Sequence, residues 1–278
     1  IYHFHDPELL PVGKKLKRKG KKVIYDAHED LPRQILQKDW IPDSLKRSIS
    51  VIFEFIENSY VKQIDAVVTV SDYIADRFQQ IAKRVIVCSN YASISEFNKI
   101  RDFNTRNNSV CYIGGITKLR GIEEVVAACE KAEVTLNLAG EFENEKLKTK
   151  ILANKNVNYL GYLDREGIQN VLAHSFAGIV TLLPAPNHNN SYPIKMFEYM
   201  ASGIPVIASN FEKWISIIEG NYAGICVDPT SIEEISNAIQ YLKENPQKAT
   251  EMGKNGRNAF EEKYNWQREE KKLIALYN

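Results

Sequence analysis

Short apolar runs alternate with helical segments over the second half of the chain, and this alternation limits the fold more than any other feature. Strands that are buried on both faces of a parallel sheet are continuously apolar in this way. Strands separated by helices of ordinary length indicate βαβ units. The expected strands are Val110–Ile113, Val134–Ala139, Val157–Leu160, Gly178–Leu182, Pro205–Ala208 and Gly224–Val227. We therefore expect an α/β domain with a parallel sheet.

The first ninety residues repeat this pattern with fewer units. The expected strands are Lys22–Asp26, Ala66–Val70 and Arg84–Cys88, and the expected helices are Glu8–Lys19 and Leu45–Ile64. A polar, irregular stretch from 90 to 108 follows and indicates a domain boundary. A length of 278 residues suits two domains. We assign residues 1–96 to the first domain, 97–262 to the second, and 263–278 to a terminal helix that packs back on the first.

Composition indicates a cytoplasmic protein without nucleic-acid partners. The formal net charge of +1 creates no overall field that attracts nucleic acid. The four cysteines, Cys88, Cys111, Cys129 and Cys226, lie mostly in apolar runs, without a C-x-x-C pair or a histidine at zinc-ligand spacing. We expect them to be reduced, buried thiols. No apolar run approaches the ~20 residues that span a bilayer, and we expect no signal peptide.

One local charge cluster stands out, from Lys14 to Lys22. It has two interpretations. The basic residues are either a solvated helix end, where cations complement the helix dipole, or a contact with anionic lipid headgroups. The second interpretation implies peripheral binding at the inner face of the membrane.

The most specific motif is the stretch NSYPIKMFEYMASGIPVIASN, which starts at Asn190. A loop leads into a short helix that ends at Gly203, and a buried strand follows. Lys195 and Glu198 fall on one face of this helix. Backbone N–H groups at a helix N-terminus attract phosphate, and a carboxylate one turn later can accept a hydrogen bond from a sugar hydroxyl.

Glu198 and the residues after it, EYMASGIPVIAS, resemble the signature of retaining GT-B glycosyltransferases of the group that contains glycogen synthases and bacterial mannosyltransferases (group 1, family 4 type). That signature has two glutamates with seven residues between them. Glu198 takes the second place, and Asn190 takes the first. The resemblance implies two Rossmann-like domains with parallel sheets and a site in the cleft between them. It also implies a first domain truncated at its N-terminus, because residues that match HFHDPELL normally follow several βα units.

The resemblance implies a nucleotide-diphosphate sugar as the donor substrate, bound by the second domain. Glu198 would hold the ribose. Gly114, Gly115 and Arg120 lie in a glycine-rich turn, where the backbone can approach phosphate and the guanidinium can donate to it. Gly115 stands where relatives have a first cation, and Lys118 and Lys195 are the candidates to replace that charge.

The loop before the Glu198 helix should meet the sugar and diphosphate through its backbone. Its donor-binding candidates are Ser191, Tyr192, Ile194 and Lys195. Asn190 can hydrogen-bond a sugar hydroxyl but cannot act as a carboxylate. Asp164 either contacts the base or ribose, as the resemblance implies, or caps a helix.

On the acceptor side, the resemblance implies that His5 faces the transferred sugar, so His5 and Asn190 are the catalytic candidates. His28 and Glu29 follow the next strand and would border the acceptor. No Asp-x-Asp pair or zinc motif is present, so we expect neither a metal nor a cofactor. The resemblance implies no protein nucleophile, with the departing phosphate helping to deprotonate the acceptor hydroxyl.

The expected function is transfer of a sugar, with retention of configuration, to a saccharide or lipid-linked acceptor, in the synthesis of a cell-surface polysaccharide or glycolipid. Two alternatives stay open. The chain could be another GT-B enzyme, such as a sugar-nucleotide epimerase or a phosphorylase. It could also be a non-catalytic nucleotide-binding or scaffold protein.

Overall fold

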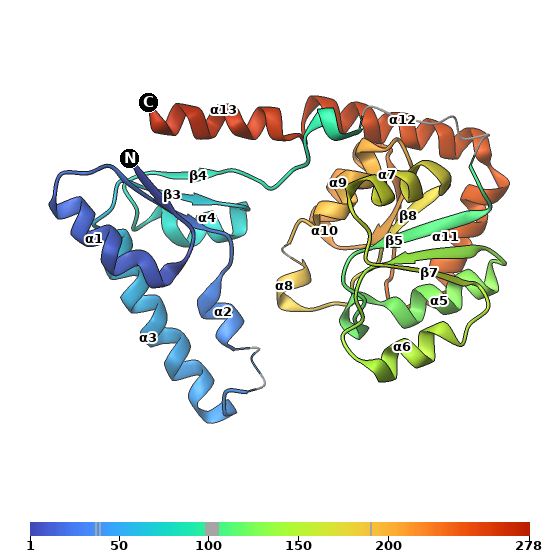
Figure 1. The fold of residues 1–278 in the computed structure, drawn as a ribbon, viewed down its shortest axis with the longest axis horizontal. Coiled ribbons are helices and arrows are strands. Elements are labelled where there is room, and N and C mark those ends of the chain that lie inside the picture. Colours follow the sequence, from blue (N-terminus) through green and yellow to red (C-terminus); the bar gives the residue numbers. More distant parts are fainter. Residues whose placement is uncertain (37, 39, 98–105, 190) are drawn as a thin grey trace. The chain divides into compact units, whose positions relative to one another are not determined.

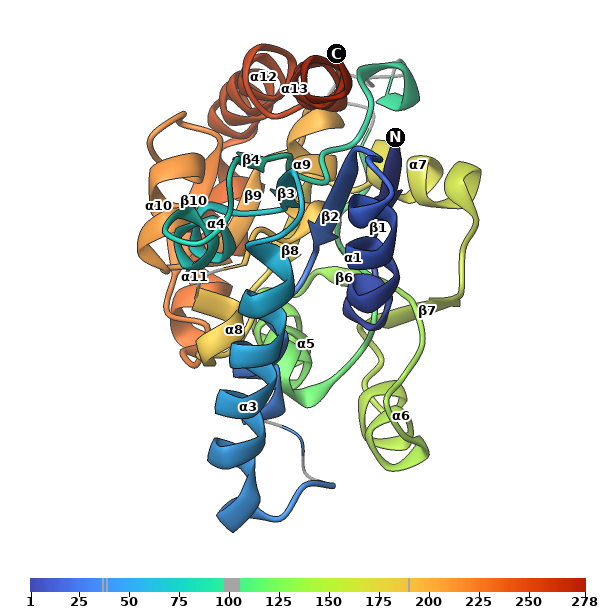
Figure 2. The same ribbon diagram turned by 90° about the vertical axis from the view of Figure 1, so that its left-hand side faces the viewer.

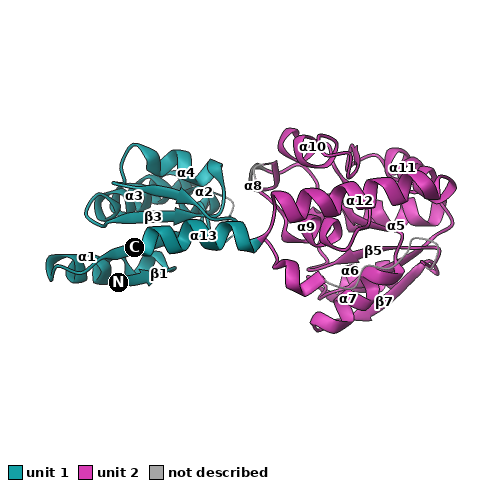
Figure 3. Cartoon of the chain, turned by 90° about the horizontal axis from the view of Figure 1, so that it is seen from above, with its two compact units in different colours: residues 1–90, 266–278 teal, residues 91–265 magenta. Residues whose placement is uncertain are grey.

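A computed structural model describes residues 1–36, 38, 40–97, 106–189 and 191–278. The chain forms two compact units (Figure 3). Unit 1 contains residues 1–90 together with residues 266–278, and unit 2 contains residues 91–265. The junction therefore falls at residue 90, a little before the position expected from the sequence. The last helix belongs to unit 1.

Unit 1 is built on a parallel sheet with the strand order β1-β2-β3-β4 (Figure 2). The strands are β1 (Tyr2–Phe4), β2 (Val23–Ala27), β3 (Ala66–Thr69) and β4 (Val85–Val87). The helices between them are α1 (Leu10–Arg18), α2 (Leu31–Ile35), α3 (Asp43–Val61) and α4 (Asp72–Gln79), and α13 spans Trp266–Tyr277. Every strand and long helix expected in this region is present.

The two faces of this sheet bury different sets of side chains, because successive residues of a strand point to opposite faces. Val23 and Tyr25 of β2 pack in a core with side chains of α1, α3 and α4. Ile24 packs on the other face with Ala66 and with Leu276 of α13. The terminal helix thus completes the hydrophobic core of a sheet formed by the N-terminal residues (Figure 1).

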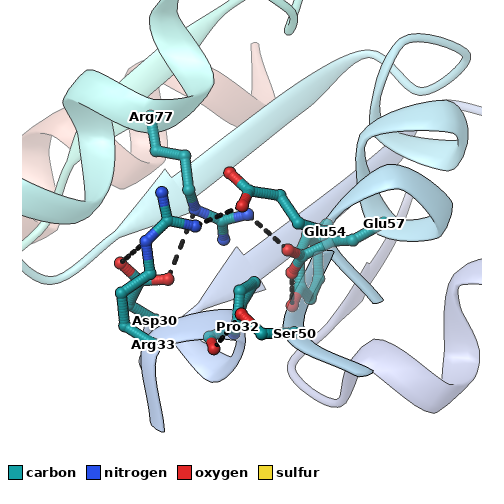
Figure 4. Close-up of polar contacts among 8 residues, drawn as sticks. Asp30, Pro32, Arg33, Ser50, Glu54, Glu57 and Arg77 are labelled. Atoms are coloured by element: carbon teal, nitrogen blue, oxygen red, sulfur yellow. Dashed lines mark hydrogen bonds and ion pairs between the residues drawn. The ribbon is translucent and has the colours of Figure 1, made fainter. Parts of the chain in front are cut away.

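Helix α3 turns polar side chains toward its own unit. Glu57 is 1% exposed, and its carboxylate accepts hydrogen bonds from Arg77 (2.5 Å) and from the Tyr25 hydroxyl (3.0 Å). A second ion pair joins Arg33 to Glu54 at 2.5 Å (Figure 4). Burial and the neighbouring Glu57 carboxylate raise the pKa of Tyr25, so the hydroxyl stays protonated and can donate. These contacts satisfy charges that would be costly to bury alone.

The outward face of α3 is apolar, which inverts the usual arrangement for a surface helix. Phe55 is 74% exposed and Ile52 is 58% exposed. The other exposed apolar side chains of the helix are Leu45, Ile49, Val51 and Ile56. We refer to these six residues as the α3 apolar face. Across the described parts of the chain, no helix combines the length and the apolarity that crossing a membrane requires.

Unit 2 is a six-stranded parallel sheet with the order β10-β9-β8-β5-β6-β7. The strands are β5 (Ser109–Ile113), β6 (Thr135–Ala139), β7 (Val157–Gly161), β8 (Ala177–Val180), β9 (Val206–Ser209) and β10 (Gly224–Val227). The helices are α5 (Ile122–Lys131), α6 (Glu145–Leu152), α7 (Arg165–His174), α8 (Pro186–Asn189), α9 (Ile194–Ala201), α10 (Glu212–Ile218), α11 (Ile232–Glu244) and α12 (Pro246–Glu262). The strand order is that of a doubly wound Rossmann-like sheet.

Helices cover both faces of this sheet (Figure 1), and a hydrophobic core lies on each face. One contains side chains of α5, α6 and α11, and the other contains side chains of α7, α9, α10 and α12. Gly178 of β8 allows α9 to approach closely, since a Cβ atom there would lie 2.3 Å from the Tyr199 ring. The Tyr199 hydroxyl in turn accepts a hydrogen bond from the Ile113 amide at 3.2 Å. Helix α9 is therefore fixed against the strands β5 and β8.

Candidate functional site

The strand order of unit 2 reverses between β5 and β8, and ligands in open α/β sheets bind at the carboxyl ends of such strands. The glycine-rich turn that begins at Gly114 follows β5 directly. The loop and helix that contain Lys195 and Glu198 follow β8. Two of the motifs identified in the sequence therefore meet at the position where the topology predicts a ligand.

Gly114 lies at the centre of this site, with a φ of 125° that side chains rarely allow. A Cβ atom on Gly114 would lie 2.9 Å from Lys195 Nζ and 3.4 Å from Arg120 Nη1. Gly140, after β6, has a φ of 137°, and a Cβ atom there would lie 2.0 Å from the Gly114 carbonyl oxygen. Both glycines keep the backbone open beside two cationic groups.

The two cationic groups belong to Lys195 and Arg120. The Lys195 Nζ atom is buried and has no hydrogen-bond partner in the described part of the chain. It lies 3.9 Å from the centre of the Tyr112 ring. Burial, and secondarily the nearby Arg120 guanidinium, lower the pKa of Lys195 to about 7. Arg120 donates to the Gly115 carbonyl oxygen at 3.4 Å. A bound anion would pair with the buried amine and would also reduce the repulsion between the two cations.

Of the two lysines considered for the missing cation, Lys195 lies beside Gly114, whereas Lys118 is exposed. The Lys118 backbone amide donates to the Glu143 carboxylate at 3.2 Å. Lys195 is therefore the lysine that the fold brings next to Arg120.

Glu198 is 8% exposed and is paired with a residue that the sequence motifs did not indicate. Arg165, the first residue of α7, donates to Glu198 Oε1 at 2.6 Å. Arg165 also forms an ion pair with Glu96. The pairing of Arg165 with Glu198 joins residues far apart in the sequence, so no local pattern could have revealed it.

The remaining donor-side candidates are positioned by local contacts. Asp164 accepts a hydrogen bond from the Gly167 amide at 2.8 Å and so caps α7, the structural role considered for it. The Ser191 carbonyl oxygen accepts from the Trp214 indole at 2.8 Å, which anchors the loop before α9. Tyr192 is half-buried and Ile194 is exposed. Asn190 lies outside the described residues.

In unit 1, His5 and His28 converge on Asp26, another residue that the motif analysis did not include. The nitrogens His5 Nδ1 and His28 Nε2 each lie 3.3 Å from Asp26 Oδ2 and are 3.0 Å from each other. His3 Nε2 lies 3.4 Å from the same oxygen. Glu29 is exposed beside His28.

The sheet register explains this cluster. His3 lies opposite Ile24 and Phe4 lies opposite Tyr25, so alternate residues of the two strands share a face. Burial alone would raise the pKa of Asp26, but hydrogen bonding to His28 and His3 outweighs it and lowers the pKa to about 2. Hydrogen bonding to Asp26 raises the pKa of His28. The cluster therefore contains a firmly ionised, mostly buried carboxylate.

The basic run divides into paired and exposed residues. Lys17 bonds to Asp65 at 2.6 Å, and Lys22 donates to the Tyr277 carbonyl oxygen at 3.0 Å. Lys14 lies 5.5 Å from the centre of the Tyr60 ring of α3. The exposed basic side chains of the run are Lys15, Arg18, Lys19 and Lys21. They lie on α1 and the turn after it, and α1 packs beside α3.

Comparison with known proteins gives a consistent result. The family model described as "Glycosyl transferases group 1" matches residues 93–259. An uncharacterized glycosyltransferase of Methanocaldococcus jannaschii, MJ1069, is 22% identical over 279 residues, which cover 95% of this chain and 69% of that protein. Glycogen synthase of Mycobacterium tuberculosis is 20% identical over 244 residues, which cover 82% of this chain and 56% of that protein. The chain thus spans only part of these relatives.

Solved structures show the same fold. Sucrose-phosphate synthase of Thermosynechococcus elongatus matches with a TM-score of 0.75 and 20% identity, over 99% of this chain and 72% of that one. Anabaena HepE, in a complex with UDP and glucose, matches with a TM-score of 0.75 and 15% identity, over 99% and 77% respectively. At these identities the likeness establishes the fold, which is the expected GT-B arrangement of two Rossmann-like sets with parallel sheets.

Proposed function

The chain belongs to the glycosyl transferases group 1 family, and from this premise we propose that it transfers a sugar from a nucleotide-diphosphate sugar to an acceptor hydroxyl, with retention of anomeric configuration. The observation that carries the proposal is the pair of cations, Lys195 and Arg120, beside Gly114 at the point where the strand order reverses. The buried Lys195 amine without a hydrogen-bond partner is suited to an anionic ligand.

In this proposal Lys195 and Arg120 bind the diphosphate. The first turn of α9 adds backbone N–H groups and the positive end of the helix dipole. The same charges stabilise the nucleoside diphosphate when the bond to the sugar breaks, so they act on the leaving group. Lys195 would then supply the positive charge that relatives have at the position of Gly115.

We assign the ribose hydroxyls to Glu198, whose carboxylate lies one turn into α9. Arg165 donates a hydrogen bond to this carboxylate and so limits its rotation. The HepE structures contain UDP, which supports a nucleoside diphosphate as ligand in this fold. The base bound by this chain stays open.

The acceptor side of the proposal rests on unit 1. His5 would contact the transferred sugar, and His28 and Glu29 would border the acceptor, a saccharide or a lipid-linked sugar. The proposal includes no protein nucleophile, no cofactor and no metal on the diphosphate. The departing phosphate would accept the acceptor proton, with Asn190 contacting a sugar hydroxyl. A role in cell-surface polysaccharide or glycolipid synthesis follows from this acceptor class.

We also propose that unit 1 binds an anionic membrane surface from the cytoplasmic side. The α3 apolar face supplies exposed hydrophobic area, and the exposed basic residues of the Lys14–Lys22 run lie on the helix that packs beside it. Amphipathic surfaces of this kind combine apolar insertion with attraction to anionic lipids. Such binding would bring a lipid-linked acceptor to the protein.

The test of the donor site is a thermal-shift titration with UDP, GDP, ADP and CDP. A nucleotide at a hundred times its dissociation constant should stabilise the fold by about 2.7 kcal/mol. We expect one nucleotide to do so, with a weaker effect in Glu198→Ala and an unchanged effect in Glu244→Ala, where the glutamate is exposed on α11. No stabilisation by any nucleotide would contradict the proposal.

Product analysis separates the alternatives. Nucleotide binding with neither sugar transfer nor donor hydrolysis would favour the non-catalytic interpretation. An absorbance band of lysine-bound pyridoxal phosphate would favour a phosphorylase.

A further inference from the structure

Three potential metal ligands in unit 1 form a nearly equilateral triangle. Its corners are His5 Nδ1, Asp26 Oδ2 and His28 Nε2. The edges measure 3.0 Å between the two nitrogens and 3.3 Å from each nitrogen to the oxygen.

These distances match one face of a metal coordination sphere. Imidazole nitrogens and carboxylate oxygens bind zinc at about 2.0–2.2 Å. Two such ligand atoms are about 3.3 Å apart at a tetrahedral angle and about 2.9 Å apart at a right angle. We propose that His5, Asp26 and His28 bind a divalent first-row transition metal of the zinc class.

The chemistry of the donor set agrees with this choice. Two imidazoles and one carboxylate suit zinc and its neighbours, whereas calcium and magnesium prefer sets of oxygen ligands. Asp26 offers its Oδ2 atom to the triangle of ligand atoms. Its second oxygen, Oδ1, is buried and has no hydrogen-bond partner among the described side chains and backbone. A metal would compensate this charge.

The surroundings also resemble a supported metal site. His3 Nε2 lies 3.4 Å from Asp26 Oδ2, and His3 Nδ1 lies 2.6 Å from the Tyr277 hydroxyl. Outer groups of this kind orient the ligands of metal centres. Because the His5 side chain is 61% exposed, the solvent side of the triangle is open to water or to a hydroxyl-bearing ligand.

The metal would lower the pKa of a bound hydroxyl group. The inference goes beyond the proposed sugar transfer by placing a metal on its acceptor side, where His5 and His28 lie. The donor site in unit 2 uses none of the three ligands. Zinc binding and nucleotide binding can therefore succeed or fail separately.

The experiment is isothermal titration calorimetry of the full chain with Zn²⁺ alone. We expect one Zn²⁺ per chain, at least tenfold weaker binding in His5→Ala and Asp26→Asn, and unchanged binding in His174→Ala, where a half-buried histidine lies in unit 2. His5→Ala is the primary variant because its side chain is largely exposed, so the fold should tolerate the change.

Co²⁺ absorption supplies the second measurement. The wild-type spectrum should show d–d bands without the sulfur-to-metal charge-transfer band that a cysteine ligand would produce. Either the absence of stoichiometric Zn²⁺ binding or equal binding by wild type and His5→Ala would overturn the proposal.

Discussion

Arg165 Nη1 donates a hydrogen bond of 2.6 Å to Glu198 Oε1, across two helices of unit 2. The Glu198 side chain is mostly buried, whereas the Arg165 side chain is 43% exposed. The carboxylate that we assign to the ribose is thus held by a cation from a different helix. A ligand at Glu198 meets a group that is already oriented.

The first prediction concerns the energy of this pair. Arg165→Ala should lower the free energy of unfolding by about 1–3 kcal/mol, because a mostly buried carboxylate loses its partner. A double-mutant cycle with Glu198→Gln should show coupling of at least ~0.5 kcal/mol. Urea unfolding measures all four proteins. The exposed pair of Lys148 with Glu145 is the control, with coupling below ~0.5 kcal/mol. Equal coupling in the two pairs would contradict the prediction.

The second prediction is a pH dependence of donor binding. Lys195 has a pKa of about 7 in the ligand-free protein, and a bound diphosphate should raise it. Between these two pKa values binding takes up a proton, so affinity should fall as pH rises above 7, by up to about tenfold per pH unit. Calorimetry with a nucleotide sugar between pH 6 and pH 9 measures this slope.

Lys195→Met should remove the slope and weaken binding at pH 6, whereas Lys118→Met, a change at the exposed lysine of the same turn, should retain it. A flat wild-type profile would show that Lys195 does not meet the anion. The same lowered pKa affects folding. The unfolded chain keeps a proton that the folded chain has lost, so the free energy of unfolding should rise with pH from about 7 up to the ordinary lysine pKa of about 10.5.

The third prediction concerns the polar interior of unit 1. Arg77→Met leaves Glu57 buried without its cation and should cost about 3–5 kcal/mol of stability. Arg33→Met removes a partner of Glu54, whose side chain is more exposed, and should cost about 1 kcal/mol or less. Chemical denaturation followed by circular dichroism compares the two. Similar losses of stability in both variants would contradict the prediction, because they would show that the Glu57 carboxylate does not depend on Arg77 for its charge compensation.

The fourth prediction tests membrane binding. The chain should sediment with vesicles containing phosphatidylserine and much less with neutral phosphatidylcholine vesicles. Ile52→Ser combined with Phe55→Ser should lower partitioning at least tenfold, since each inserted apolar side chain contributes about 1.5–3 kcal/mol. Leu152→Ser, which alters an exposed leucine of unit 2, is the control. No sedimentation, together with a dimer in solution, would instead assign the α3 apolar face to a second copy of the chain.

Most of the fold could be predicted because parallel strands are continuous apolar runs. The strand expected at Gly224–Val227 has these bounds in the structure, and the run expected at Val134–Ala139 differs from β6 by one residue. The sequence pattern does not predict helices α2 and α8. Each is too short to show a 3.6-residue period, and short helices depend on tertiary contacts. In α2, the Ser50 hydroxyl of α3 donates to the Pro32 carbonyl oxygen at 2.6 Å.

The candidate site could be predicted only where it follows local motifs. Glu198 and Arg120 lie in recognisable sequence motifs, but only the fold distinguishes Lys195 from Lys118, by placing the Lys195 amine beside Gly114. The sequence also contains a signal for Asp26. His3 and His5 recur at a period of two, as do Asp26 and His28, and the second residue of each pair directly follows its strand. The register between the strands, which the sequence does not encode locally, makes them one cluster.

Unit 1 is assembled from both ends of the described chain, with unit 2 inserted between them. A premature stop codon after Asn265 would leave every strand and helix of unit 2 encoded but would remove α13. The loss of α13 would expose the sheet face that contains Ile24 and Ala66, more than 170 residues upstream, because Leu276 covers this face. Truncations within residues 266–278 would therefore destabilise the sheet that β1 to β4 form.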